Sequence, residues 1–387
     1  MFDRKAMGEI WRAWWPILAA ITLLQTGNGL TGTLISVTSE AQGFAPWLKG
    51  LVLSAFYAGS LAGALAAPTA IARSSHITAF AGFAMLLSAA TAGYSVSADP
   101  LAWSALRFAA GFGISGAFAV VESWLNLSTA NERRARVFSI YIMVQLGGLA
   151  LGQLLLNARA VGNEILFFLA AGFSLIAVAC LRFERVQNPH YEPPTKLSLR
   201  ELARRSPFGV AAVALSGFAW AALMASGPAL VELIGFSDFA KSMFMIAAIV
   251  SGMVAQFPLG SLADRMDRRR VLALKAAAAA IASLAGLAGL DFVILIVFAV
   301  TFGAATLPLY AIGVARVNER LQQSERTAAS AGMIAAFLIG AFVAPPIFAY
   351  ATALFGPQAY FVLLAIPHAA FALLAVLILR SRVVQSS

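Results

Sequence analysis

Apolar runs separated by short polar stretches recur along almost the whole chain. They lie at 14–38, 47–71, 76–96, 101–125, 137–158, 165–181, 207–234, 242–262, 271–288, 292–315, 327–353 and 358–379. Most are long enough to cross a hydrocarbon core of about 30 Å, which needs roughly 20 residues of helix. Strands of a membrane barrel would alternate apolar and polar residues over about ten positions, and these runs do not. The pattern predicts an all-α membrane protein with twelve transmembrane helices.

The longest polar stretch, residues 182–206, separates the sixth run from the seventh. It is rich in charged residues and prolines, as linkers between domains commonly are. Within it, Glu201 stands four residues before Arg205, a spacing that predicts a short surface helix. We therefore expect a six-helix N-terminal bundle at 1–181, a cytoplasmic linker at 182–206 and a six-helix C-terminal bundle at 207–387.

Two short patterns recur about half a chain apart. Gly63 and Gly260, which we expect to open the loops after the second and eighth helices, are 197 residues apart. Glu132 and Glu325, each followed by arginine between two predicted helices, are 193 residues apart. A nearly constant offset is expected of a transporter built from two repeated bundles, so the two halves are predicted to be pseudo-symmetric.

The composition supports a membrane environment. Hydrophobic residues make up 60% of the chain and charged residues 11%, with a mean hydropathy of +0.83. An ordinary soluble domain carries about 25% charged residues, so this chain has too little polar surface to be water-soluble. The single cysteine, Cys180, rules out an intrachain disulfide, and no ligand spacing indicates a metal or cofactor.

The net charge of +10 would suggest a nucleic-acid partner in a soluble protein, but the positions of the charges indicate topology. Of the 27 lysines and arginines, 23 fall in loops on the side of the N-terminus, three on the opposite side, and Arg107 inside a predicted helix. Positive residues are enriched on the cytoplasmic side of membrane proteins. We therefore expect a bacterial inner-membrane protein with both termini in the cytoplasm and no nucleic-acid partner.

The loop after the eighth predicted helix carries the strongest local motif. A glycine is followed by an acid, a basic residue and a basic pair, at Gly260, Asp264, Arg265, Arg268 and Arg269. Glycine allows two helices to approach closely, an acid can bond to the end of a neighbouring helix, and arginines hold the loop at the anionic leaflet. We expect a gating latch, with a purely topological basic loop as the alternative. The first-half copy, which begins at Gly63, lacks the acid and the basic pair.

The fourth predicted helix contains an arginine followed by glycines, at Arg107, Gly111 and Gly113. A guanidinium two turns inside a transmembrane helix must face a polar cavity or a partner, unless it reaches the headgroups by snorkelling. With Gly116, the glycines also fit a dinucleotide-binding fingerprint, but the strand that must precede such a turn is missing. We therefore interpret them as sites of close helix packing.

Glu122 lies 15 residues after Arg107 on the same helix. At 100° per residue, the two share one face, about 22 Å apart along the axis, so they do not pair. Glu122 could be a protonatable coupling residue, or it could pair with a loop arginine such as Arg133 or Arg136. Both interpretations stay open.

Three other charged residues, Lys49, Glu232 and Lys275, lie near the ends of predicted helices, where snorkelling would explain them. Several prolines lie within the predicted helices and are expected to bend them: Pro68, Pro228, Pro258, Pro308, Pro345, Pro346 and Pro367.

With these motifs, the whole chain resembles the major facilitator superfamily. The segment from Val121 to Trp124, with Tyr141 and the stretch 152–155, is similar to the YcaD-like bacterial transporters. The resemblance implies two six-helix bundles around a central cavity, and alternating access. In that family the arginine of the fourth helix faces the cavity and is often linked to proton coupling.

The first, fourth, seventh and tenth helices line the cavity in that family. By this resemblance, the candidate cavity residues are Gln25, Asn28, Arg107, Trp220 and Tyr310. The fifth helix lacks the Gly-Pro pair of the family's antiporter signature, since no proline lies between Gly147 and Gly152.

These patterns predict a secondary active transporter that moves a small solute, coupled to protons, with Arg107 and Glu122 as the coupling residues. A facilitative uniporter and a multidrug or metabolite efflux protein are the alternatives. An enzyme or a scaffold is disfavoured, because no catalytic motif and no large extramembrane domain is present. The expected partners are an unidentified small-molecule substrate, the lipid bilayer and protons, with no cofactor, and we expect a monomer.

Overall fold

The computed structural model describes residues 4–181, 189, 197–322 and 325–386. Every regular element in these ranges is helical. The elements are α1 (Arg4–Ala41), α2 (Pro46–Arg73), α3 (His76–Gly93), α4 (Pro100–Ser128), α5 (Asn131–Leu155), η1 (Leu156–Val161), α6 (Asn163–Cys180), α7 (Leu199–Arg205), α8 (Pro207–Ala221), η3 (Ala222–Ser226), α9 (Gly227–Leu233), α10 (Asp238–Arg265), α11 (Arg268–Ala285), η4 (Gly286–Ala288), α12 (Phe292–Thr306), α13 (Leu309–Asn318), α14 (Glu325–Phe355) and α15 (Gln358–Ser386).

The twelve predicted helices are all found in the described ranges, and the all-α prediction is confirmed. The seventh consists of α8, η3 and α9, and the tenth consists of α12 and α13. Within the same ranges, eleven helical stretches are long and apolar enough to span a membrane. The predicted linker helix is α7, whose first turn is capped by Ser198 accepting a hydrogen bond from the Glu201 amide.

The chain divides into two compact units by its internal contacts. The first unit comprises residues 1–34 and 58–193, and the second comprises 35–57 and 194–387. Residues 35–57 are the end of α1, the loop after it and the start of α2, and we call them the docked segment. Because α1 and α2 are continuous through residues 34 and 58, each of these helices belongs partly to both units. The division at 1–181 and 207–387 stays a prediction.

Close helix packing organises the first unit. A Cβ atom added at Gly63 would overlap the Phe112 carbonyl oxygen, so α2 and α4 touch through their backbones. On the other side of α4, a Cβ at Gly113 would lie 2.7 Å from the Phe83 carbonyl oxygen of α3. The packing interpretation of the α4 glycines fits these contacts. Gly63 lies inside α2 and does not open a loop, contrary to our expectation, because α2 continues to Arg73.

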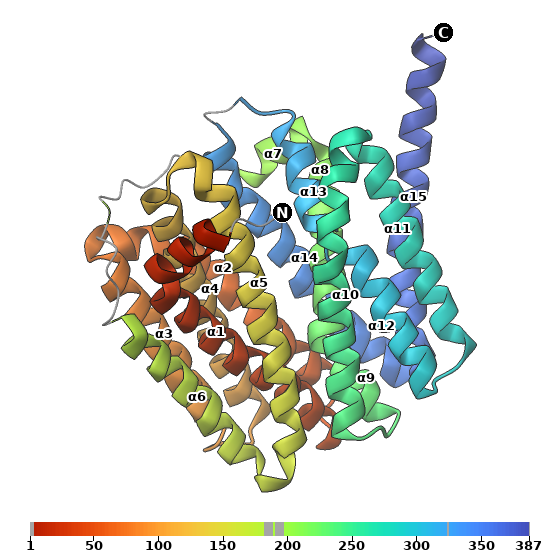
Figure 1. The fold of residues 1–387 in the computed structure, drawn as a ribbon. Helices are drawn as coiled ribbons and strands as arrows, with labels where there is room; N and C mark the ends of the chain where they lie inside the picture. Colours follow the sequence, from red (N-terminus) through yellow and green to blue (C-terminus); the bar gives the residue numbers. More distant parts are fainter. Residues whose placement is uncertain (1–3, 182–188, 190–196, 323–324, 387) are drawn as a thin grey trace. The chain divides into compact units, whose positions relative to one another are not determined.

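The helices of the second unit extend from one end of that unit to the other, with an apolar core between them. In Figure 1, α7 lies near the upper end of this unit, and the loop that follows α9 lies at the lower end. A stacked aromatic pair, Phe208 of α8 and Phe371 of α15, packs with ring centroids 4.5 Å apart near the α7 end. This aromatic pair belongs to an apolar core cluster that also contains Leu272 and Leu309.

Prolines act differently along the chain. Pro308 separates α12 from α13, and Pro228 follows the π-helical turn η3 that interrupts the seventh helix. Pro68 and Pro367, in contrast, lie inside helices that continue through them. A π-helical turn inside a helix, such as η3, is often found at functional sites.

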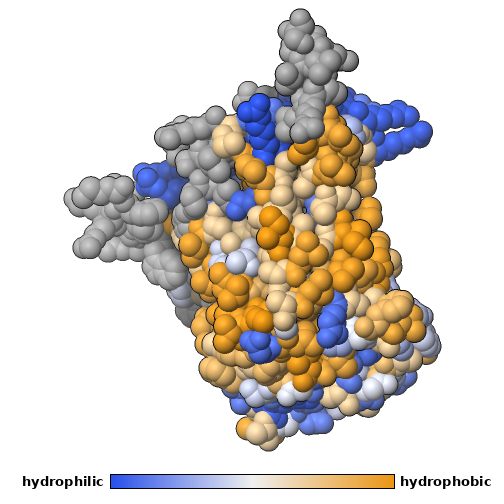
Figure 2. Space-filling model, turned by 90° about the vertical axis from the view of Figure 1, so that its right-hand side faces the viewer, coloured by the Kyte–Doolittle hydropathy of each residue, from blue (hydrophilic) through white to orange (hydrophobic). Residues whose placement is uncertain are grey.

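A hydrophobic belt covers the face of the second unit formed by α11 and α15. Figure 2 shows this face coloured mainly hydrophobic across its middle, with hydrophilic residues towards the two ends. Ile281 of α11 is 67% exposed and Ile366 of α15 is 61% exposed. Such exposure would be costly in water, so this belt is the surface that contacts lipid.

Candidate functional site

Arg107 is buried inside the first unit, only 4% exposed. It lines a small enclosed cavity between α1, α3, α4 and α6, together with Asn28, Thr91 and Ser174. The guanidinium also lies close enough to the Tyr94 hydroxyl to interact with it. Arg107 is therefore buried beside a small cavity of mixed lining inside its own unit, and it does not reach the headgroups by snorkelling.

The other candidate cavity residues lie in different places. Asn28 shares the cavity with Arg107, and its amide donates a hydrogen bond to the Gln25 side-chain oxygen at 3.1 Å. Trp220 and Tyr310 lie in the second unit, where Tyr310 packs edge-on against Phe337. The structure thus brings Asn28 to the cavity that Arg107 lines, and Gln25 is bonded to Asn28. The roles predicted for all five residues stay predictions.

Glu122 meets a tyrosine, not an arginine, among the described residues. The Tyr141 hydroxyl of α5 donates a hydrogen bond to a Glu122 carboxylate oxygen at 3.2 Å. On the next residue, the Ser123 hydroxyl lies 3.2 Å from the His76 Nε2 atom of α3. The segment around Glu122 thus connects α4 to both α3 and α5, so that the carboxyl group sits at a junction of three helices.

Tyr141 was not identified as a site residue from the sequence. The contact joins residues 19 positions apart across a loop, so no helical spacing connects them. The only available signal was that Tyr141 belongs to the stretch that is similar to the YcaD-like transporters.

A side-chain clamp holds α1 against α5 in the first unit. The Thr33 hydroxyl donates to the Gln153 side-chain oxygen at 2.7 Å, and the Gln153 amide donates to the Gly29 carbonyl oxygen at 3.1 Å. A Cβ at Gly29 would lie 2.5 Å from the Leu149 carbonyl oxygen, so the helices are also in backbone contact. This clamp ends at the last residues of α1 that belong to the first unit, so it anchors α1 just before the docked segment begins.

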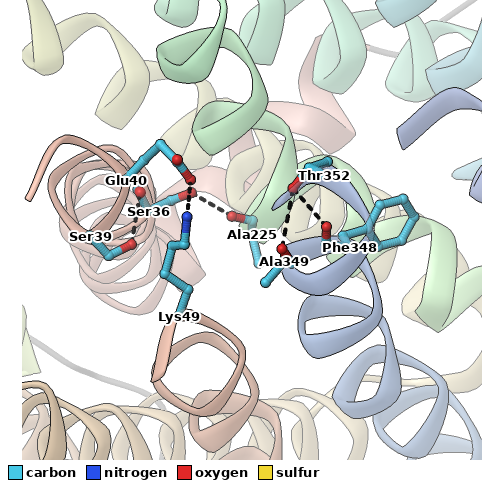
Figure 3. A network of polar contacts seen from close by, with 8 residues as sticks. All are labelled: Ser36, Ser39, Glu40, Lys49, Ala225, Phe348, Ala349 and Thr352. Carbon is cyan, nitrogen blue, oxygen red and sulfur yellow. Dashed lines mark hydrogen bonds and ion pairs between the residues drawn. The ribbon is translucent and has the colours of Figure 1, made fainter. Parts of the chain in front are cut away.

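The docked segment carries a buried ion pair. The Lys49 ammonium lies 2.8 Å from a Glu40 carboxylate oxygen, and the two side chains are 10% and 14% exposed (Figure 3). Lys49 therefore pairs with an acid and does not snorkel, contrary to our expectation. Because the two charges are removed from water together, each depends on the other for compensation.

Direct contacts fix this segment to the second unit. The Ser36 hydroxyl donates to the Ala225 carbonyl oxygen of η3 at 2.5 Å (Figure 3). The Ser54 hydroxyl donates to the Phe342 carbonyl oxygen of α14 at 2.6 Å. A Cβ added at Gly50 would lie 2.6 Å from the Pro346 Cα atom, so α2 and α14 are in close backbone contact. The segment thus packs on η3 and α14.

The ion pair lies beside a small enclosed space. Glu40, Lys49 and Ser226 line it with residues of α9, α14 and α15, and its volume is about 20 Å³. A water molecule needs about 10–15 Å³ measured in this way, so the space holds little more than one. The docked segment is therefore packed closely on the second unit at this point.

Two other charged residues that we assigned to snorkelling have partners in the second unit. Glu232 and Asp238 both pair with Lys241, which is 4% exposed. The Lys275 ammonium donates to the Ala304 carbonyl oxygen at 3.1 Å. Pro308 has no N–H to donate to that carbonyl, four residues before it, so Lys275 satisfies a group that the proline leaves free.

The predicted gating loop is only partly within the described residues. Helix α10 runs through Gly260 and Asp264 to Arg265, but the side chains of these three residues lie outside the described part, so the predicted latch stays a prediction. Asp267 caps α11 by accepting a hydrogen bond from the Arg269 amide at 2.7 Å. Asp267 therefore has a local structural role at the start of α11.

An ion cluster links this loop to the tenth helix. Arg268 at the start of α11 pairs with Glu319 at the end of α13, and Glu319 also pairs with Arg316. Arg269 is only 8% exposed and packs inward. The sequence did not identify Glu319, because it is separated from Arg268 by 51 positions. The structure thus gives Arg268 a carboxylate partner on the neighbouring helix.

The linker helix α7 is fixed to α14 by a second ion cluster. Arg205 pairs with Glu201 at 2.7 Å and with Glu325 at 2.8 Å. Leu202 is fully buried against α14, and the Leu197 amide donates to the Ala328 carbonyl oxygen at 3.1 Å. Ionic, apolar and backbone contacts therefore hold α7 and Leu197 on α14.

Acid is expected to loosen this contact. The Gln322 amide and Arg205 hold the pKa of Glu325 below its ordinary value of 4.5. A carboxyl group whose pKa is lowered on folding contributes stability at pH values above its ordinary pKa. This contribution is lost as the pH falls through the pKa of the folded state. Hydrogen exchange of α7 should show lower protection factors near pH 3.5 than at pH 7, and Glu325→Gln should remove most of that difference. An equal pH effect in both proteins would contradict it.

Comparisons with known proteins agree with this architecture. The family model of the Major Facilitator Superfamily matches residues 17–254 and 247–387. The uncharacterized MFS-type transporter YcaD of Escherichia coli (strain K12 / DH10B) is 26% identical over 353 residues, covering 90% of this chain and 91% of the relative.

Two solved structures share the fold. The nucleoside transporter NupG superposes with a TM-score of 0.75 at 15% identity, covering 93% of this chain and 97% of that chain. A bacterial homologue of the human lysosomal transporter Spinster superposes with a TM-score of 0.71 at 17% identity, covering 93% and 96%. Together with the family match over nearly all residues, these findings show that the chain belongs to the major facilitator superfamily of membrane transporters.

Proposed function

We propose that this transporter moves a small solute across the bacterial inner membrane by alternating access, coupled to protons. The observation that carries the proposal is the docked segment. Helices α1 and α2 start or continue in the first unit, yet residues 35–57 pack on η3 and α14 of the second unit. Two continuous helices that contact different units at their two ends provide the mechanical link that alternating access needs.

In this proposal the docked segment is the periplasmic gate. The distribution of basic residues favours a cytoplasmic location for the loops on the side of the N-terminus, and the loop between α1 and α2 would then be periplasmic. With the segment docked, the periplasmic end is closed. Undocking would expose Glu40 and Lys49 to water and open that end to solute, while the clamp at Gln153 keeps α1 attached to the first unit.

Coupling is assigned to the first unit. Glu122 is the proton carrier, since its carboxyl group is partly buried and, within the described part of the chain, is bonded by the hydroxyl group of Tyr141. Arg107 cannot release its proton, so it acts as a fixed positive charge inside the same helix bundle. A facilitative uniporter is the second candidate, and it would equilibrate the substrate without accumulating it against a gradient.

The orientation is tested by labelling single cysteines introduced at Ser198 and Ser237. Both positions are exposed, one at the start of the linker helix and one in the loop between α9 and α10. In a Cys180→Ala background, a membrane-impermeant maleimide applied to intact spheroplasts should label Ser237→Cys only, and Ser198→Cys should react after the membrane is permeabilised. Labelling of both positions from outside would contradict the topology.

A further inference from the structure

A long groove runs between α10 and α12 in the second unit. Its volume is about 880 Å³, and along α10 it extends from Phe239 to Ala255, about 24 Å. The two helices touch through their backbones, since a Cβ atom added at Gly303 would lie 2.4 Å from the Ala248 carbonyl oxygen. The groove is therefore a feature of the surface that α10 and α12 share, and it is large enough for a long, narrow ligand.

The lining of the groove suits hydrocarbon. Within the described part of the chain, no charged residue lines it, and the Ser251 hydroxyl donates to the Ala248 carbonyl oxygen of its own helix at 3.1 Å. Two of its apolar residues are well exposed, Val254 at 57% and Phe239 at 58%. A site for a polar solute would carry a few polar groups that fix its orientation. We therefore expect a hydrocarbon chain from the membrane in the groove.

A lysine lies at one end of the groove. The Lys275 ammonium of α11 donates to the carbonyl oxygen of Ala304, which lines the groove, at 3.1 Å. Ala255, towards the same end, packs on the apolar cluster that contains Leu272 and Ala276, which flank Lys275 on α11. The hydrocarbon groove therefore ends beside a positive charge.

This charge has no acidic partner among the residues that the structure describes. Lys49 and Lys241, the other described lysines of the second unit, both pair with carboxylates. Lys275 is half-buried, about two turns inside the membrane span that begins at Arg268, and the Ala304 carbonyl oxygen uses one of its three N–H donors. An unpaired charge in a spanning helix is unfavourable, so an anionic group beside Lys275 would be stabilising.

We propose that the groove between α10 and α12 binds an anionic phospholipid, with one acyl chain along the groove and the phosphate group paired with Lys275. The phosphate supplies the negative charge that the groove lacks and accepts hydrogen bonds from the ammonium. A zwitterionic lipid carries its own cation beside the phosphate, so it gains less from the lysine. The proposed orientation places this lipid in the cytoplasmic leaflet, where basic residues attract anionic lipids. The groove and its lysine do not depend on that orientation.

The test is thermal unfolding of the purified full-length protein in detergent micelles, with added phosphatidylglycerol compared with phosphatidylcholine of the same acyl chains. A ligand that binds the folded state raises the unfolding temperature with its concentration. The wild type should show a larger, saturable rise with phosphatidylglycerol. Lys275→Gln keeps a donor for the Ala304 carbonyl oxygen and should weaken apparent phosphatidylglycerol binding about tenfold, because a hydrogen bond between two charged groups is lost.

Matched variants separate the site from general effects. Arg320→Gln removes one exposed positive charge beside Glu319, the partner of Arg268, and should keep the wild-type response. Ala247→Phe fills the groove and should abolish the phosphatidylglycerol response. Ala278→Phe makes the same change at an exposed position of α11 outside the groove and should keep the response.

Equal rises with the two lipids, or a phosphatidylglycerol response that is unchanged in Lys275→Gln, would overturn the proposal. A rise of the same size with inorganic phosphate alone would assign Lys275 to a free anion and would also overturn it. If Lys275→Gln does not fold, the difference between the two lipids and the comparison of Ala247→Phe with Ala278→Phe decide.

Discussion

Lys49→Met is expected to release the docked segment and hold the transporter open at the periplasmic end. In the docked state the variant leaves the largely buried Glu40 carboxylate without its cation. Removing one partner of a fully buried pair costs about 3–5 kcal/mol, and because this pair is partly exposed we expect about 3 kcal/mol. Undocking returns the carboxylate to water and removes that cost. A shift of about 3 kcal/mol changes the ratio of docked to undocked molecules roughly a hundredfold.

The readout is maleimide labelling of Leu53→Cys from the periplasmic side, in the Cys180→Ala background. Leu53 is 3% exposed in the docked arrangement, so labelling should be slow with Lys49 present and fast with Lys49→Met. Transport should fall at least tenfold, because the docked state becomes rare.

Two controls separate gating from general damage. The double variant Glu40→Leu with Lys49→Met should restore much of the slow labelling. Its apolar pair places no unpaired charge in the docked state, so undocking no longer gains the hydration of a carboxylate. Lys241→Met breaks another buried pair at the same end, with Glu232 and Asp238, but does not touch the docked segment. Fast labelling in Lys241→Met, or no rescue in the double variant, would contradict the gate assignment.

Glu122→Gln is expected to abolish accumulation of substrate against a gradient while exchange of substrate persists. The amide keeps the shape of the carboxyl group and can still bond to Tyr141, but it cannot carry a proton. Accumulation in proteoliposomes with an imposed pH gradient should therefore fall to simple equilibration. A thermal-shift screen against metabolites and drugs supplies the substrate for this assay, because a bound ligand raises the unfolding temperature.

Tyr141→Phe is the matched variant for Glu122. It removes the hydroxyl partner and keeps the titratable group, so accumulation should be reduced but retained. Arg107→Ala should abolish both exchange and accumulation, because the fixed charge inside the bundle is lost. Full gradient-driven accumulation by Glu122→Gln would show that Glu122 only joins α4 to α5.

The helices and the short linker helix were predictable because their signals are local. Long apolar runs determine the spans, and Ser198 together with the Glu201 to Arg205 spacing determines α7. The close packing of the α4 glycines was also predictable, since glycine is favoured wherever two backbones must approach.

The gate could not be predicted, because its contacts are not local. Ser54 bonds to Phe342, 288 positions away, and Ser36 bonds to Ala225, 189 positions away. Hydrophobic patterning records which face of a helix is buried but not which unit buries it. The Lys49 partner was missed for a related reason, since Glu40 is joined to it by a turn between two helices and not by a helical repeat.

One missed contact did have a sequence signal. Pro308 removes the N–H that would bond to the carbonyl of Ala304, so a donor from a neighbouring helix was needed at that depth. Lys275 supplies it, and its position inside the ninth helix was visible in the sequence. Assigning the lysine to snorkelling ignored the carbonyl that the proline leaves free.

The central claim is that residues 35–57 dock on and leave the second unit during transport. The most direct measurement is the distance between spin labels at Trp47 and Phe355, which are 50% and 74% exposed at the start of α2 and the end of α14. Pulsed electron resonance on the protein in nanodiscs should give two distance populations, with the longer one enriched by Lys49→Met. A single distance, unchanged by Lys49→Met and by substrate, would contradict the account.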